Sequence, residues 1–293
     1  MLEAVPNVSE GRDAGAIEEI GHAFASRAKL LDVHADADHH RSVFTLAGEA
    51  EPLVESLLAG IARALELVDL RAHDGVHPRV GAVDVVPVVH LVPSEVALAE
   101  ETALAVAHRA GAELDLPVFL YGTVGGGKRP AFFRSGGLAE LERRLEAREL
   151  RVDAGPSRID PRVGAILVGA RPPLVAYNVD LGVDDIGVAR AIAASIRESG
   201  GGMPGVQAIG LELTRTGRVQ VSLNVLDLER SPLHEVVERI RQEAVWRGVK
   251  VVDGELVGLV PERVLADAAA AGVTIPGVGS SRVLERALGS SRL

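Results

Sequence analysis

The sequence predicts a protein of mixed α+β (α/β) class, built from two units of split βαβ type. The chain has 293 residues, of which 47% are apolar, a length that suits two domains and a composition that can fill two cores. Segments with strand and helix periodicity alternate, and the alternation begins again near residue 165. Arg171-Pro172-Pro173 marks a boundary, because consecutive prolines interrupt strand ladders and helices alike. We therefore expect one domain at residues 1–173 and another at 174–293.

The first half supplies five strand patterns and four helix patterns. The helix at 51–68 is the clearest, because Leu53, Leu57 and Ile61 recur at helical spacing. The expected strands are 2–5, 29–33, 42–47, 80–92 and 118–122, and the expected helices are 13–28, 51–68, 95–112 and 138–150.

The second half contains a hairpin pattern between helices. Residues 206–213 and 219–225 alternate in polarity around Arg215-Thr216-Gly217, as the two strands of a hairpin do. Antiparallel hairpins interleaved with helices are typical of split βαβ units. The other expected strands are 165–168, 174–179 and 256–260, and the expected helices are 184–199 and 232–247, followed by two short ones.

Composition excludes several classes of function. The net charge of −10 repels phosphate backbones, so we expect no nucleic-acid partner. No run of about 18 apolar residues occurs, so we expect no membrane span. The chain has no cysteine, which excludes disulfides, thiolate zinc sites and cysteine nucleophiles. Together with an N-terminus that lacks a signal-peptide pattern, this favours a cytoplasmic protein.

Two motifs suggest ligands that we do not expect. The stretch from Gly122 to Lys128 matches the first seven positions of a phosphate-binding P-loop, but Arg129 replaces the hydroxyl residue that would hold magnesium, and Pro130 follows. The alternatives to a nucleotide site are a flexible glycine loop and a loop that meets a substrate anion. The segment 33–42, VHADADHHRS, has the composition of a metal site without a recognised ligand spacing, so we expect a polar loop and no metal.

The segment 72–87, AHDGVHPRVGAVDVVP, carries the most informative cluster. Pro78 holds His77 in an extended conformation. Arg79 lies two residues on, pointing to the same side, where its charge would keep the imidazole neutral. Asp84 interrupts an apolar strand and needs a partner, such as a catalytic imidazole. His77 is therefore a candidate general base, with Arg79 and Asp84 as catalytic partners, and a surface-loop histidine is the alternative.

Several segments together resemble the glutamate formimidoyltransferase (formiminotransferase) family. They include VPNVSEGR at 5–12, GVHPRVGAVDVVP at 75–87, GPSRIDPRVG at 155–164 and SLNVLDLERSPLH at 222–234. The resemblance covers nearly the whole chain and is similar to the formiminotransferase part of the bifunctional formimidoyltransferase-cyclodeaminase. It implies two formiminotransferase subdomains, at 1–173 and 174–293, with a substrate cleft or tunnel between them.

The resemblance also implies an activity. Enzymes of this family transfer the formimidoyl group from N-formimidoyl-L-glutamate to N5 of tetrahydrofolate, releasing L-glutamate, in histidine degradation. It implies tetrahydrofolate as a co-substrate, small-molecule substrates only, a homodimer, and a separate cyclodeaminase acting downstream. A folate-dependent formyl transfer to or from glutamate, a non-catalytic folate-binding protein and, on the histidines near residue 34, a metallohydrolase are the alternatives.

The family's functional residues fall on particular positions. Its catalytic histidine falls on His77. Candidates for substrate binding are Arg12, Arg41 and His40. The family often has asparagine where His40 stands, and the animal enzymes have aspartate where His34 stands, so the roles of these two histidines stay open. The folate-binding segment falls on Gly155, Pro156, Ser157, Arg158, Ile159, Asp160, Pro161, Arg162, Val163 and Gly164.

Overall fold

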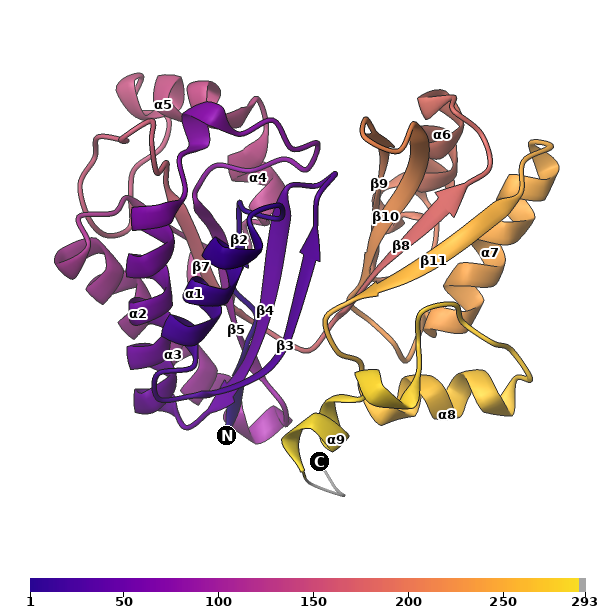
Figure 1. Cartoon of the computed structure of the whole chain (residues 1–293), viewed down its shortest axis with the longest axis horizontal. Coiled ribbons are helices and arrows are strands. Elements are labelled where there is room, and N and C mark those ends of the chain that lie inside the picture. The colour runs from indigo at the N-terminus through magenta and orange to yellow at the C-terminus, as the bar shows by residue number, and fades with distance from the viewer. Residues whose placement is uncertain (290–293) are drawn as a thin grey trace. The chain divides into compact units, whose positions relative to one another are not determined.

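The computed structural model describes residues 1–289, and their strands and helices confirm the predicted α+β class. The chain divides into two units, Met1–Pro172 and one that begins at Pro173 (Figure 1). The described helices are too short or too polar to cross a membrane.

The first unit is built on a seven-stranded mixed sheet. Its strands are β1 (Leu2–Ala4), β2 (Asn7–Val8), β3 (Lys29–Asp36), β4 (Arg41–Gly48), β5 (Val83–His90), β6 (Val118–Gly122) and β7 (Ile166–Arg171). β3 pairs with β4, and the short strands β1 and β2 both lie between β4 and β5. β5, β7 and β6 continue the sheet as parallel neighbours.

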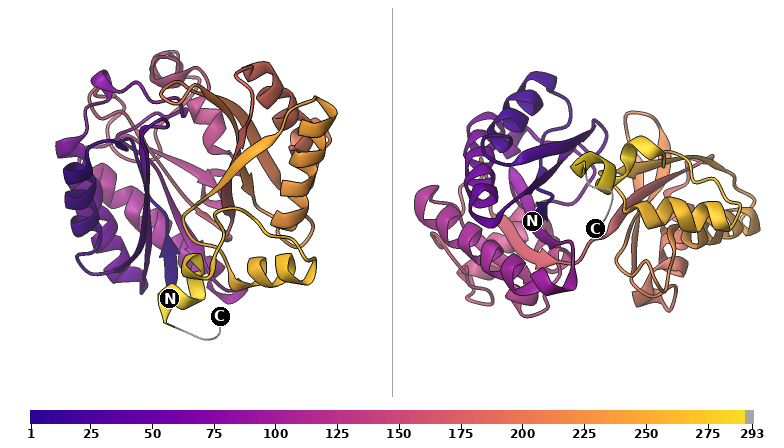
Figure 2. Two further views of the ribbon diagram at one scale, coloured as in Figure 1. Left: turned by 45° about the vertical axis from the view of Figure 1, so that its right-hand side comes forward. Right: turned by 90° about the horizontal axis from the view of Figure 1, so that it is seen from below.

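Helices form two layers on this sheet. They are α1 (Ala14–Phe24), α2 (Ala50–Leu67), α3 (Val96–Glu113), α4 (Pro130–Arg134) and α5 (Gly137–Glu146), with 3-10 turns at Leu70–Ala72, Pro93–Glu95 and Thr123–Gly125. α1, α2 and α3 pack on one face through a core that includes Phe24, Phe44 and Ile61 (Figure 2). α4 and α5 share a smaller core with Phe119.

The second unit is a four-stranded antiparallel sheet with helices. Its elements are β8 (Val175–Leu181), α6 (Ile186–Ile196), β9 (Val206–Leu213), β10 (Arg218–Val225), α7 (Leu233–Trp246), β11 (Val251–Val257), α8 (Glu262–Ala270) and α9 (Leu284–Leu288), with 3-10 turns at Glu198–Gly200 and Ser280–Arg282. The strand order is β11-β8-β10-β9. The pairing of Leu213 with Arg218 confirms the predicted hairpin, and Tyr177, Ile192 and Ile240 lie in the core.

The main differences from the sequence prediction lie in β11, β5, β2 and α4. β11 begins at Val251, five residues before the predicted strand, because a bulge between Val251 and Asp253 lets the polar part of the segment pair with β8. The predicted strand at 80–92 is hydrogen-bonded as β5 only from Val83 to His90. The short strand β2 and helix α4 were not expected. Pro130 starts α4, where its missing N–H does no harm.

Candidate active site

A buried carboxylate organises the site in the first unit. Asp84 lies at the start of β5, beside a bulge in its pairing with β2, and is 0% exposed. Its Oδ1 accepts the Val80 N–H at 2.8 Å, and its Oδ2 accepts Arg41 Nη1 at 3.1 Å and Arg134 Nη2 at 2.5 Å. Burial alone would raise the pKa of Asp84, but Arg134, Arg41 and the Val80 N–H lower it below its ordinary value. The carboxylate is therefore ionised and fully bonded.

Arg41, at the start of β4, links this carboxylate to His77. Its Nε and Nη2 donate to Asn7 Oδ1 at 2.9 and 2.6 Å, and Asn7 is held in turn by a 2.7 Å bond from its Nδ2 to the Val5 carbonyl. Arg41 Nη1 lies 2.8 Å from His77 Nδ1. Burial lowers the pKa of Arg41 to about 10, so the guanidinium is still charged at neutral pH.

His77 has two alternative partners for one ring nitrogen. Its Nδ1 lies 2.8 Å from Arg41 Nη1 and 2.8 Å from the Pro78 carbonyl oxygen. Arginine can only donate, so the first contact needs a lone pair on Nδ1, whereas the carbonyl can only accept and needs a proton there. Burial, then Arg41 and Arg134, lower the pKa of His77 well below its ordinary value. The ring is therefore neutral, and each of its tautomers has a partner.

Arg79 organises the loop before the strand. Its Nη1 donates to the carbonyls of Gly75 at 2.7 Å and His77 at 3.1 Å, and its Nη2 donates to the His73 carbonyl at 3.0 Å. We expected Arg79 to keep the His77 imidazole neutral; the pKa of His77 is lowered by burial first and then by Arg41 and Arg134. All three of these bonds are to backbone carbonyls. A direct part for Arg79 in catalysis stays a prediction.

His73 is committed to the same loop. Its Nε2 donates to the His40 carbonyl at 2.7 Å and its Nδ1 accepts the Gly75 N–H at 3.1 Å. Burial, as the main cause, lowers the pKa of His73 to about 4. Both nitrogens are thus used, and the His40 ring stacks on this imidazole with 4.1 Å between centroids.

The predicted substrate-binding residues divide between two clusters. Arg41 belongs to the Asp84 cluster. The Nε2 atom of His40 lies 3.1 Å from Glu10 Oε1. Arg12 donates from Nη1 to Asp74 at 2.5 Å and from Nε to the Ala37 carbonyl at 2.9 Å. Burial would raise the pKa of Glu10, but the N–H groups of Asp13 and Arg12, with His40, lower it. His40 and Arg12 thus lie beside the loop that Arg79 holds, and their contact with substrate stays a prediction.

The segment Gly155–Gly164 and Ala165 after it are hydrogen-bonded through the backbone to the residues just before β5. The Ala82 N–H donates to the Val163 carbonyl at 2.8 Å, and the Ala165 N–H donates to the Val80 carbonyl at 2.9 Å. Gly164 has φ 75°, and a Cβ there would lie 2.1 Å from the Val80 oxygen, so only glycine permits this approach. The segment predicted to bind folate therefore adjoins the strand that carries Asp84.

The glycine loop and the segment 33–42 both build local structure. In the glycine loop, the Gly122 N–H donates to the Lys128 carbonyl and the Gly127 N–H to the Gly122 carbonyl, both at 2.8 Å. In the segment 33–42, Asp36 Oδ1 accepts the N–H groups of Asp38 and His39 at 2.8 Å each, which closes a turn. Within residues 1–289, no three His, Cys, Asp or Glu side chains are grouped as metal ligands. The absence of a metal stays a prediction.

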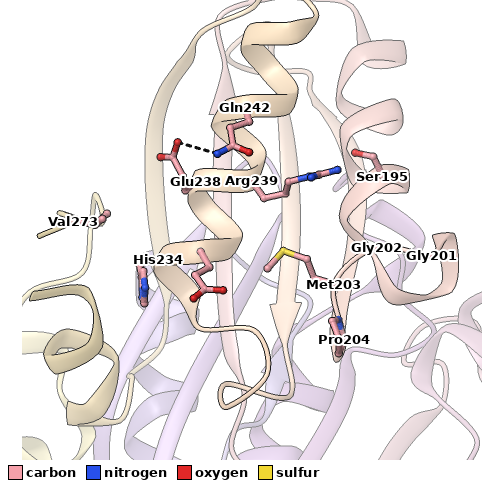
Figure 3. Close-up of a pocket in the computed structure, with 11 residues that line it drawn as sticks. Ser195, Gly201, Gly202, Met203, Pro204, His234, Glu238, Arg239, Gln242 and Val273 are labelled. Atoms are coloured by element: carbon pink, nitrogen blue, oxygen red, sulfur yellow. Dashed lines mark hydrogen bonds between the residues drawn. The ribbon is translucent and has the colours of Figure 1, made fainter. Parts of the chain in front are cut away.

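A separate pocket lies in the second unit, between α6 and α7. Figure 3 shows Met203 and Ser195 facing the side chain of Arg239 across it. Arg239 is already paired with Glu243 at 2.9 Å. The pocket contains none of the residues that the sequence predicts for the site.

Sequence reasoning missed Arg134 and the role of Asn7. Arg134 is the last residue of a five-residue helix, which is too short to show a helical periodicity in the sequence, and it lies 50 residues along the chain from Asp84. Asn7 lies in the N-terminal signature VPNVSEGR, which was the one available signal for it.

A neutral, partly buried histidine held by an arginine–carboxylate cluster has the chemistry that proton transfer requires. Residues 1–171 match the family described as "Formiminotransferase domain, N-terminal subdomain", and residues 176–273 match "Formiminotransferase domain". The chain belongs to the formiminotransferase family.

Curated relatives agree with this assignment. The chain is similar to the glutamate formimidoyltransferase of Thermoplasma acidophilum, at 36% identity over 98% of this chain and 96% of the relative. That of Streptococcus pyogenes serotype M1 is 37% identical over 92% of each. The formimidoyltransferase-cyclodeaminase of Gallus gallus is 39% identical over 92% of this chain, which spans 52% of that protein.

Proposed function

We propose that this protein transfers the formimidoyl group from N-formimidoyl-L-glutamate to N5 of tetrahydrofolate and releases L-glutamate, as a step of histidine degradation. Two findings support this. The family assignment covers both units, with residues 1–171 and 176–273 matched. In the first unit, His77 is held neutral with a partner for Nδ1 in either tautomer, and this is the observation that carries the proposal.

The reaction needs one proton to be moved between two nitrogens. N5 attacks the formimidoyl carbon, the new C–N bond forms, and N5 loses its proton. The bond from that carbon to the glutamate nitrogen then breaks, and the departing nitrogen gains a proton. A single neutral imidazole can accept the first proton and deliver it to the leaving group.

The contacts of His77 support Nε2 as the nitrogen that accepts and releases the proton. For Nε2 to accept a proton, Nδ1 must carry one, and in that tautomer Nδ1–H donates to the Pro78 carbonyl. Once Nε2 is protonated, the imidazolium lies beside Arg41 and Arg134, whose charges disfavour it. The ring therefore releases the proton readily, which suits a shuttle between acceptor and leaving group.

Tetrahydrofolate enters as the second substrate. We place its contacts at Gly155–Gly164, because this segment adjoins the start of β5 and its glycines allow close backbone approach. Arg158 and Arg162 would pair with the carboxylates of its glutamate tail. A cytoplasmic location and a homodimer are further expectations.

A turnover assay tests the proposal. Purified protein is mixed with N-formimidoyl-L-glutamate and tetrahydrofolate, and 5-formimidoyltetrahydrofolate and L-glutamate are quantified by mass spectrometry. We expect both products in equal amounts. A parallel reaction with N-formyl-L-glutamate tests the formyl alternative, and product in that reaction alone would overturn the formimidoyl assignment.

A further inference from the structure

Arg134 has hydrogen-bonding capacity that the protein leaves unused. Its Nη2 donates to Asp84 Oδ2, and its side chain is 15% exposed. Its Nε is buried and forms no hydrogen bond with the residues that the structure describes. Arg41 differs, because its Nε, Nη1 and Nη2 all have partners in Asn7, His77 and Asp84. A buried donor without an acceptor is costly, so an acceptor that arrives with a ligand would be favoured.

The charge around Arg134 is also unbalanced. Arg41 and Arg134 share one carboxylate oxygen, Oδ2 of Asp84. His77 contributes no negative charge. Tyr121, buried in the same region, keeps its proton, because burial raises its pKa to about 12. The cluster therefore holds two guanidiniums against one carboxylate, and a second anion would compensate the excess positive charge.

We propose that Arg134 binds a carboxylate of the substrate, with Asp84 fixing the guanidinium for that purpose. The proposal rests on the proposed function and identifies the ligand chemistry of the same site. Asp84 takes one hydrogen of Nη2. The other Nη2 hydrogen shares an edge of the guanidinium with either Nε–H or Nη1–H, and either edge matches a carboxylate in a bidentate pair. We assign this carboxylate to the glutamate part of the one-carbon donor.

Asp84 then connects the two tasks of the site. One of its oxygens holds both Arg41, which contacts the shuttle His77, and Arg134, which would hold the substrate. Asp84 would therefore fix the position of the formimidoyl carbon relative to the proton acceptor His77, as efficient group transfer requires.

Binding measurements with one substrate at a time test this proposal. Isothermal titration calorimetry would follow N-formimidoyl-L-glutamate with no folate present, and tetrahydrofolate with no donor present, so that no turnover occurs. The variants are Arg134→Gln and, as a matched control, Arg129→Gln, which removes an exposed guanidinium just before the same helix. We expect Arg134→Gln to weaken donor binding by about 10- to 100-fold, with tetrahydrofolate affinity unchanged and Arg129→Gln equal to wild type.

Arg134→Lys provides a second variant, which retains a positive charge beside the Asp84 carboxylate. It should raise the KM for the donor while changing kcat less, because an ammonium cannot form the bidentate pair. Weaker tetrahydrofolate binding with unchanged donor binding would overturn the assignment to the donor and place the folate tail on Arg134. Unchanged affinity for both ligands in folded Arg134→Gln protein would overturn carboxylate binding altogether. Wild-type protein that binds the donor through Arg134 but yields no product would instead contradict the proposed function.

Discussion

Replacement of Asp84 by asparagine should destabilise the protein by about 3–5 kcal/mol, the usual effect of removing one partner from a buried ion pair. The side chain is 0% exposed and accepts from three donors, Val80, Arg41 and Arg134. Asparagine can keep one oxygen as an acceptor, but its NH₂ group then faces another donor. Two buried guanidiniums would also lose their shared counter-charge. The predicted loss is therefore at the upper end of what single substitutions cause.

Urea unfolding followed by far-UV circular dichroism measures this loss. Fluorescence is the wrong probe, because the single tryptophan, Trp246, lies in the second unit. Asp74→Asn is the matched control, because Asp74 pairs with Arg12 while 70% exposed, and it should leave stability nearly unchanged. Since folding lowers the pKa of Asp84, its stabilisation is present above pH about 4 and is lost as the pH falls further. Equal stability of Asp84→Asn and wild type at pH 7 would refute the account of Asp84 as the centre of the cluster.

Three further predictions concern the charges and ligands of the site. Activity should fall in acid as His77 becomes protonated, and Arg134→Gln should move this fall to higher pH, because it removes a cation that lowers the pKa of His77; a pH–rate profile of kcat that does not move would contradict this. The double variant Arg158→Gln/Arg162→Gln should bind tetrahydrofolate more weakly, and the deficit should grow with the length of the polyglutamate tail, by about 1 kcal/mol or more for each lost pair; equal affinities would exclude charge pairing there. Activity should survive dialysis against EDTA, and turnover lost on chelation and restored by added metal would show that a metal is required.

The sequence could identify the parts of the site that depend on local geometry. An aspartate inside the apolar strand 83–90 indicates a buried polar partner. The hairpin of β9 and β10 follows from alternation around a turn. These features are set by neighbouring residues, so periodicity and turn chemistry can reveal them.

The partners in the site could not be identified in this way. Arg134 reaches Asp84 from a short helix 50 residues away, and Asn7 aims Arg41 across 34 residues. Arg79, which two-residue spacing placed beside His77, turns instead to the carbonyls of its own loop. Which arginine meets which group depends on strand order and on the bulge at β5, and no local pattern of charge encodes either.

The kinetics of His77→Ala test the central claim most directly. In protein shown to be folded by circular dichroism, kcat for formimidoyl transfer should fall by about 10²- to 10⁴-fold, the usual loss for a general acid–base. Tetrahydrofolate affinity should stay within a few-fold of wild type, because the imidazole acts on the moving proton. His108→Ala, which truncates an exposed histidine on α3, should match wild type in both measurements. A folded His77→Ala protein that binds folate and turns over at near wild-type rate would contradict the assignment of His77 as the proton shuttle.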